Sequence, residues 1–169
     1  MSIIKANKWQ TVAGIPVNNI VQMVQVDYNT YQSFVANAAT DTGLTLSITP
    51  RFATSKILVL CSAQIGHAGG SVVRGRIKRT GPATVYSASS DASSSTGWTT
   101  TLYNPVGTSY MHANSTIQWF DSPASTSTCT YTFQTANNTT GVVVYLNGYN
   151  AYTSVWGGTS HLTLMEIAQ

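Results

Sequence analysis

The side chains that could do acid–base chemistry are few and widely spaced in this sequence. Its five carboxylates are Asp27, Asp41, Asp91, Asp121 and Glu166. Asp27, Asp41 and Asp121 lie in or beside turn-like sequence, where an aspartate commonly caps local backbone amides. No two carboxylates are close in sequence, although a fold could bring two together for the cleavage of a glycosidic bond. We therefore predict that the protein is not an enzyme.

The three histidines do not match the spacing of a metal site. His67 stands in the glycine-rich sequence "GHAGG", which reads as a turn, His112 falls within an expected strand, and His161 falls at a strand start. None has a second histidine or a cysteine at ligand spacing. The chain also has no G-x-S-x-G elbow, phosphate-binding loop or dinucleotide fingerprint. The sequence predicts no metal and no cofactor.

The two cysteines are far apart, and each is in phase with apolar residues of its own segment. Cys61 alternates with Ile57, Val59 and Ile65, and Cys129 is in phase with Phe133. Buried free thiols are the prediction. A disulfide between two facing strands stays open, because a sequence does not place the two Cα atoms.

One basic cluster, Arg74, Arg76, Lys78 and Arg79, interrupts a chain that otherwise carries little charge. If the segment is a strand, the first three side chains share one face. Such a row could contact phosphate or an acidic partner. It could equally be a solvated outer face, or a charged edge that blocks strand pairing. We favour this second interpretation and predict no nucleic-acid partner, because no aromatic residue alternates with the cations to stack a base.

Aromatic residues gather in an uncharged segment near the C-terminus, "NGYNAYTSVWGG", at residues 147–158. Tyr149, Tyr152 and Trp156 stand there, and Trp98 ends a low-complexity segment at residues 87–100 that is expected to be a surface loop. Tyr and Trp offer large contact areas at small entropic cost, beside adaptable Ser, Gly and Asn. The segment could bind a neutral ligand such as a sugar, form a protein interface, or pack under the edge of the fold.

Composition favours one β-rich domain with a nearly uncharged surface. Charged residues make up 8% of the 169 residues, against about 25% in ordinary soluble domains. Ser, Thr, Asn, Gly and Tyr replace them, which suits pleated strands joined by polar turns. Surfaces with few charges are also common where a protein packs against copies of itself.

Period-two apolar patterns predict an antiparallel β-sandwich of about 8–10 strands. An extended arm at residues 1–17 is expected before this domain at residues 18–169, with Ile3, Ile4 and Trp9 as apolar anchors and Lys5 and Lys8 beside them. The start of the sequence lacks the apolar run of a secretory signal, and residues 57–61 are far too few to cross a membrane. Strands are expected at residues 20–28, 30–37, 44–49, 55–66, 71–79, 83–87, 109–119, 128–135, 141–147 and 161–168.

Several short blocks, in order along the chain, resemble a family of jelly-roll domains in virion proteins of tailed phages, cyanophages above all. They are "KWQTVAGIPVNNIVQ", "TDTGLTLSITPRFATSKILVLCSAQIG", "FDSPASTSTCTYTFQ" and "HLTLMEIAQ". The resemblance implies that the antiparallel β-sandwich at residues 18–169 is a jelly-roll domain and forms trimers similar to tumour necrosis factor-like heads, used in tail fibres or as capsid cement. No family motif of binding residues comes with it.

Three functions follow as hypotheses. The leading one is a homotrimeric decoration or cement protein, made in the host cytoplasm and bound to the virion surface. Its arm, residues 2–17, would clamp the major capsid protein or a tail component. The alternative is a tail-fibre or receptor-binding head that stacks host surface glycans on Trp98, Tyr149, Tyr152 and Trp156. The third, a glycan-cleaving enzyme, predicts released reducing ends, and we expect none.

Overall fold

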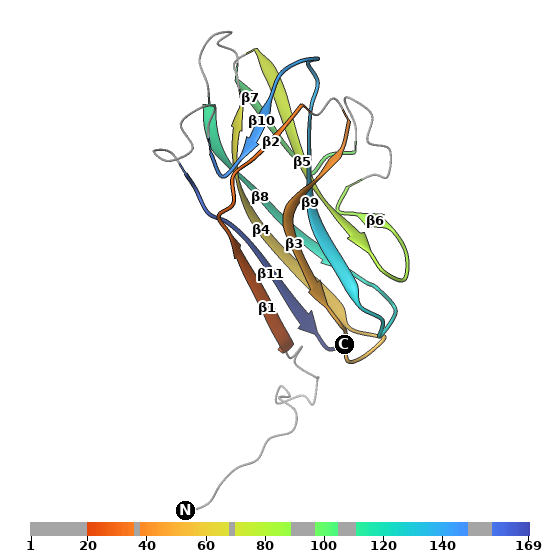
Figure 1. Ribbon diagram of the computed structural model, residues 1–169. Coiled ribbons are helices and arrows are strands. Elements are labelled where there is room, and N and C mark those ends of the chain that lie inside the picture. The colour runs from red at the N-terminus through yellow and green to blue at the C-terminus, as the bar shows by residue number, and fades with distance from the viewer. Residues whose placement is uncertain (1–19, 36–37, 68–69, 89–96, 105–110, 149–156) are drawn as a thin grey trace, which may run out of the picture.

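The computed structural model describes residues 20–35, 38–67, 70–88, 97–104, 111–148 and 157–169. Within them the chain forms eleven strands in two antiparallel sheets that pack face to face (Figure 1). The strands are β1 (Ile20–Tyr28), β2 (Gln32–Phe34), β3 (Thr40–Ile48), β4 (Lys56–His67), β5 (Ser71–Thr80), β6 (Val85–Tyr86), β7 (Thr100–Asn104), β8 (Met111–Asp121), β9 (Cys129–Asn137), β10 (Val144–Leu146) and β11 (Ser160–Ile167).

The first sheet is built around β4, the longest strand. On one side β4 pairs with β8 along its length from Ile57 to His67. On its other side it pairs first with β11 and then, nearer His67, with β10. β11 and β10 pair in turn with β1 and β2. β1 and β2 therefore occupy one strand position of the sheet, one after the other, and β11 and β10 occupy the next. We call each such position a line, and the first sheet has four lines.

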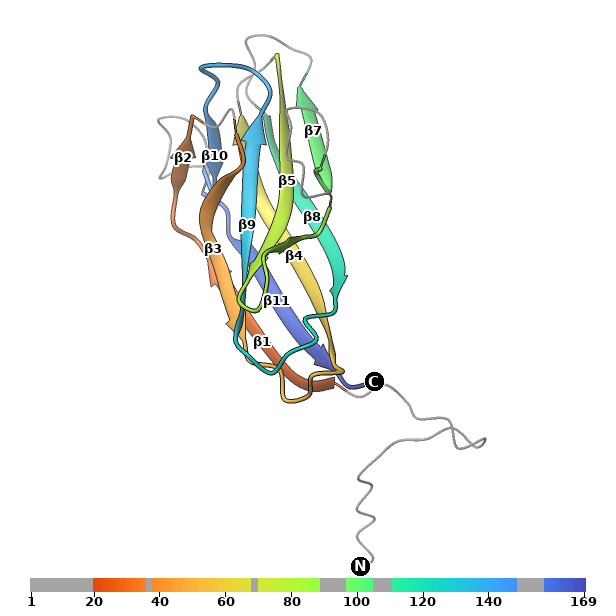
Figure 2. The same ribbon diagram turned by 90° about the vertical axis from the view of Figure 1, so that its right-hand side faces the viewer.

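The second sheet has the order β3–β9–β5, with β6 and β7 one after the other along the far side of β5. The segment at residues 87–99 interrupts this last line. The two sheets therefore hold eight lines, in the orders β1/β2–β11/β10–β4–β8 and β3–β9–β5–β6/β7. This is the jelly-roll arrangement, and it confirms the predicted antiparallel sandwich (Figure 2).

The core lies between the sheets and is made by the inward phase of each strand. On β4 this phase is Ile57, Val59, Cys61, Ala63 and Ile65, all essentially fully buried. Strand β9 faces them with Cys129, Tyr131 and Phe133, and β11 contributes Leu162 and Leu164. Each fully buried side chain of Leu or Ile size contributes about 1.5–3 kcal/mol to folding. Gly75 of β5 is needed because a Cβ there would lie 2.8 Å from the Phe133 ring.

Both ends of the described chain lie at one end of the sandwich. Ile20, where β1 begins, pairs with Ile167, where β11 ends (Figure 1). The expected arm at residues 1–17, with its anchors Ile3, Ile4, Lys5, Lys8 and Trp9, lies outside the described residues. No described helix is long and apolar enough to cross a membrane.

Two histidine positions are as predicted and one is not. His112 falls within β8, and His161 falls at the start of β11. His67, expected in a glycine-rich turn, instead ends β4, fully buried, with its Nδ1 atom 3.0 Å from the Ser71 hydroxyl. The sequence interpretation missed this because β4 continues through Gly66, which the pattern of glycines had suggested as the start of the turn.

Candidate functional site

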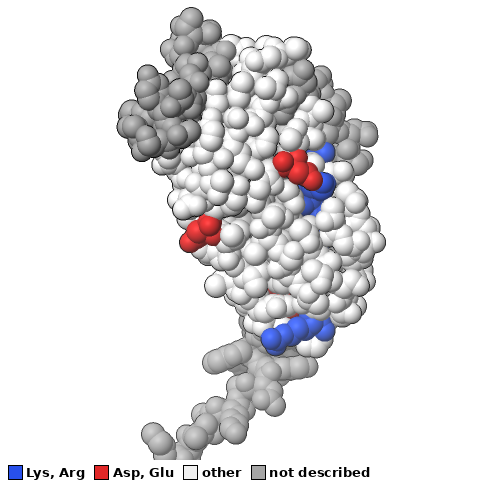
Figure 3. Space-filling view, in the orientation of Figure 1, with Lys and Arg blue, Asp and Glu red and all other residues white. Residues whose placement is uncertain are grey.

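The basic cluster of β5 is not a solvated outer face or a charged edge, so that interpretation is wrong. β5 lies inside its sheet, between β9 and the β6/β7 line. Arg76 is only 2% exposed, and Arg79 is turned into the core. Lys78 forms an ion pair with Asp41. Figure 3 shows that charged side chains are few on the face of the molecule that it draws. Three members of the cluster, Arg76, Lys78 and Arg79, are therefore engaged within the fold.

Arg76 lies on the outer side of its sheet but is covered by two aromatic rings. Its guanidinium carbon is 3.9 Å from the centre of the Tyr86 ring and 5.0 Å from that of the Trp98 ring. Its Nε donates to Gln134 at 2.7 Å, and Gln134 donates to Asp41 at 2.5 Å. Burial lowers the pKa of Arg76. Trp98, predicted as a possible ligand-binding ring, is half-buried, and its ring lies over the Arg76 guanidinium.

Arg79 forms a buried ion pair with Asp121, with 2.6 Å between Nε and Oδ2. The Tyr131 hydroxyl donates to the same carboxylate oxygen at 2.8 Å. Burial, and then the negative charge of Asp121, raise the pKa of Tyr131. Asp121 also accepts from the Ser122 amide at 2.8 Å, which is the local cap predicted for it. The group joins β5, β8 and β9 between the sheets and is structural.

Glu166 is a second buried carboxylate, and it fixes the turn between β3 and β4. It accepts from the amides of Arg51 and Phe52 at 2.8 and 3.2 Å, and from the Gln22 side chain at 2.7 Å. Burial by itself raises its pKa. The nearby Ser55 hydroxyl and these donors outweigh burial and leave the pKa below its ordinary value. Gln22 also donates to the carbonyl of Thr49, so the start of β1 is held to the same turn.

Asn147 holds the base of the aromatic segment. It is buried, with a positive φ of 57°. Its side chain donates to the carbonyls of Tyr28 and Thr30 at 2.7 and 3.2 Å and accepts from Ser160 at 2.5 Å. Its carbonyl accepts from the Gly158 amide at 3.4 Å, so residues 147 and 158 lie side by side.

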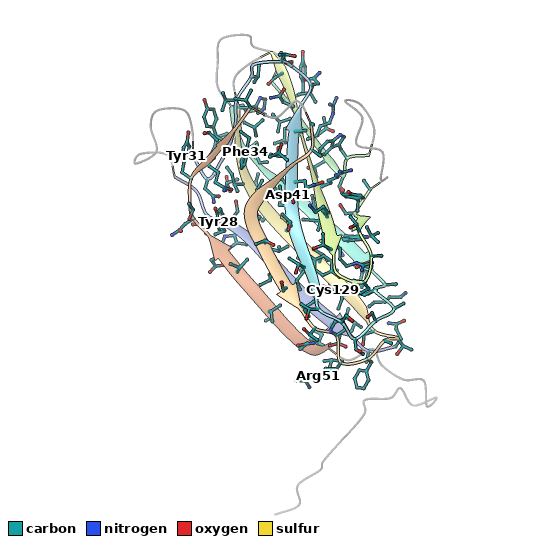
Figure 4. The ribbon with its side chains drawn as sticks, turned by 45° about the vertical axis from the view of Figure 1, so that its right-hand side comes forward. Tyr28, Tyr31, Phe34, Asp41, Arg51 and Cys129 are labelled. Carbon is teal, nitrogen blue, oxygen red and sulfur yellow. The ribbon has the colours of Figure 1, made fainter. Side chains whose placement is uncertain are left out.

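The aromatic residues of that segment, Tyr149, Tyr152 and Trp156, lie outside the described residues. Described aromatic rings do lie beside its base. The Tyr31 and Tyr145 rings stack with 6.1 Å between their centres, and a Cβ on Gly148 would lie 2.4 Å from Tyr31. Tyr28, Tyr31 and Phe34 lie along this side of the molecule, far from Arg51 (Figure 4).

The outward face of the β1–β11–β4–β8 sheet carries polar and apolar side chains and few charges among the described residues. Strand register sets its side chains in rows that cross all four lines. One row is Asp27, His161, Ser62 and Thr116, and the next is Gln25, Thr163, Leu60 and Gln118. The third row is Met23, Met165, Leu58 and Phe120, which is apolar across the whole sheet.

The apolar row is accessible at both of its ends. Met23 is 57% exposed, Phe120 is 54% exposed, and Ile20 beside them is 60% exposed. Ile20, Phe120 and Ile167 line one shallow hollow with Lys56 and Gln169. The described charges on this face stand at its margins, with Asp27 on β1, paired with His161 at 2.8 Å, and Lys56 near the end of β4. The sequence interpretation missed this surface because only the strand register aligns the four residues of the row.

The described residues contain no group of three or more His, Cys, Asp or Glu side chains that could hold a metal ion. Cys61 and Cys129 are buried free thiols, as predicted, and burial raises the pKa of Cys61 to about 12. The outward face of the first sheet, with its apolar row, is the candidate site that the strand register defines.

Comparison with known proteins adds no family. No protein-family model matches the chain, and no curated protein matches it. Among solved structures, the chain is similar to a chain in the structure of infectious bursal disease virus, Gx strain, at 11% identity and a TM-score of 0.33. The match covers 98% of this chain and 41% of that one. At this identity and TM-score the similarity carries no argument.

Proposed function

We propose that this chain is a structural virion protein that works by packing against protein surfaces, as a homotrimeric decoration or cement protein on a tailed-phage capsid. The observation that carries the proposal is the outward face of the β1–β11–β4–β8 sheet, with its apolar row Met23, Met165, Leu58 and Phe120. The blocks of sequence that resemble phage virion jelly rolls supply the virion context and the three-fold state.

The physical chemistry of this face suits self-packing. Apolar side chains that cross a sheet gain about 25 cal/mol for each Å² that a partner covers. Charged residues are depleted in the centre of protein interfaces, and the described charges of this face stand at its margins. Three copies could therefore bring such faces together without opposing like charges.

The rival, a glycan-binding fibre head, draws less support from the described residues. Stacking a sugar needs an accessible aromatic ring, and Trp98 already lies over Arg76. The other three rings assigned to that function lie outside the described residues. The rival therefore rests on the composition of residues 147–158 alone.

The proposal is tested by immunogold labelling of intact virions with antibody against this chain. Label spread evenly over the head is the expected result. Label confined to the tail would favour the fibre, and virions without label would contradict a virion function altogether.

Attachment is tested by deleting residues 2–17. Because the arm precedes the first strand of the sandwich, the truncated chain should still fold and form trimers, but it should no longer bind particles that lack the protein. A truncated trimer that binds as the full chain does would contradict the clamp.

A further inference from the structure

The two sheets have four outer edges, and the fold protects three of them against pairing with another strand. The β1/β2 edge is interrupted after Tyr28 and has a register shift between Ile20 and Gln22. The β3 edge has a register shift between Asp41 and Thr45. The β6/β7 edge consists of two short strands separated by residues 87–99. Short strands, bulges and charges are the devices that prevent edge-to-edge association.

The fourth edge, β8, has none of these devices. It pairs with β4 through eleven consecutive residue pairs without a register shift. Its sequence, MHANSTIQWFD, contains no Pro, Lys, Arg or Gly, and its single carboxylate is the buried Asp121 at its end. Within the described residues β8 pairs only with β4. Among the described residues, its other side is a long edge without charged side chains, at the side of the sandwich where β7 also lies (Figure 2).

This edge is also held rigidly from inside the sandwich. The Ser115 hydroxyl lies 2.6 Å from the Thr100 hydroxyl of β7, and Ile117 is part of the core. At the end of the strand Asp121 is fixed by Arg79 and Tyr131. The alternate residues His112, Asn114, Thr116, Gln118 and Phe120 remain exposed. A strand fixed in this way can accept a partner strand without first having to be ordered.

We propose that β8 pairs antiparallel with β8 of a second copy of this chain, across a two-fold axis at Thr116. The first sheets of the two copies would then form one continuous sheet. In this register Thr116 lies opposite Thr116 of the other copy, Asn114 lies opposite Gln118, and His112 lies opposite Phe120. The contact goes beyond the three-fold packing proposed above and does not depend on it.

The chemistry of the edge favours a second copy as the occupant. A two-fold contact places each side chain opposite its counterpart from the same strand, so charges on the strand would face like charges. β8 has no charged residue among its exposed positions, and opposite amides can exchange hydrogen bonds. Among the described strands β8 pairs only with β4, so the backbone groups on its other side can pair with those of an identical edge.

A cysteine at the two-fold position tests this register. Residues opposite each other in an antiparallel pair have Cα atoms about 4.5–5.5 Å apart, within the range that a disulfide spans. In Thr116→Cys, mild oxidation should link most chains in pairs, read as a doubled mass on a non-reducing gel. Cys61 and Cys129 are buried and should not compete. The control Thr54→Cys, exposed in the β3–β4 turn, should give no more than background linkage.

A charge at the same position tests the association itself. Thr116→Lys places two lysines opposite each other and should weaken the pairing by about tenfold. At a protein concentration near the dissociation constant of the wild-type pair, the average mass measured by sedimentation should then fall, while Thr54→Lys should leave it unchanged. Equal behaviour of the two lysine variants, or no cross-link in a folded Thr116→Cys chain, would overturn the proposal. So would loss of the cross-link on deletion of residues 2–17, because the arm would then be what joins the copies.

Discussion

The carboxylate of Glu166 binds donors from both a turn and a neighbouring strand, so its protonation should be visible in the stability of the whole domain. Its pKa in the folded chain is below the ordinary value of 4.5. A lowered pKa means that the folded state stabilises the charged carboxylate. Its contribution to the free energy of unfolding is therefore complete above about pH 4.5 and is lost as the pH falls below that value.

We expect Glu166→Gln to lower the free energy of unfolding by about 1–3 kcal/mol at pH 7. The new side-chain NH2 group would face backbone amides that themselves donate, so buried donors would lose their acceptor. The loss should shrink at pH 3, below the ordinary pKa of 4.5, because the unfolded chain then binds a proton at Glu166 and the carboxylate contributes less to stability. Urea denaturation at both pH values measures it, with the exposed Asp27→Asn as a control that should change little. An equal loss at the two pH values would contradict the assigned role.

The Arg79–Asp121 pair gives a second prediction at the residue scale. Asp121→Ala leaves a buried guanidinium without its counter-charge and should cost about 3–5 kcal/mol of unfolding free energy. The double variant Arg79→Met/Asp121→Leu removes both charges and should recover a large part of that loss. Urea denaturation compares the two. A double variant less stable than Asp121→Ala would show that the ion pair itself, and not the relief of an unpaired charge, dominates.

At the scale of elements, Asn147 joins the two interrupted strand lines of the first sheet. Asn147→Ala removes its hydrogen bonds to Tyr28, Thr30 and Ser160 and places alanine at positive φ. We expect a loss of about 2–4 kcal/mol in unfolding free energy. Asn147→Gly loses the same bonds but tolerates the backbone, so it should be more stable than the alanine variant by about 1 kcal/mol. Thermal and urea unfolding measure the stability of the alanine and glycine variants. Equal stability of the two would show that backbone strain at residue 147 does not contribute.

Most elements could be predicted from the sequence because their apolar alternation is strong. The first expected strand, residues 20–28, coincides with β1, and the expected strand at 55–66 differs from β4 by one residue at each end. Strand β7 was not predicted, because "TTLYN" follows a low-complexity segment and has only Leu102 as an inward apolar residue. Its pairing with β5 is a long-range contact that local pattern does not contain.

The candidate site could be predicted only in part, because burial of polar residues depends on partners distant in sequence. Arg76 is covered by Tyr86 from the next strand and by Trp98 from beyond it, so its own segment gave no sign of burial. The apolar row likewise combines residues from β1, β4, β8 and β11. Composition did predict a nearly uncharged surface, and the outward face of the first sheet has that character.

At the scale of the whole molecule, the outward face of the first sheet should decide how many copies associate. Met23 is exposed at the end of the apolar row that is farthest from β8. Met23→Lys should therefore dissociate the three-fold assembly and leave a folded chain, because the side chain does not belong to the core. Far-UV circular dichroism checks folding, and Thr54→Lys is the matched surface control. A variant that keeps the mass of the wild type would remove this face from the interface.

The most direct test of the central claim is sedimentation equilibrium of the full wild-type chain, compared with its Met23→Lys variant. A structural protein that packs through its first sheet predicts a species of three chains, or of six where β8 pairs two trimers, reduced to one or two chains by Met23→Lys. A wild-type species of one or two chains at micromolar concentration would contradict the account.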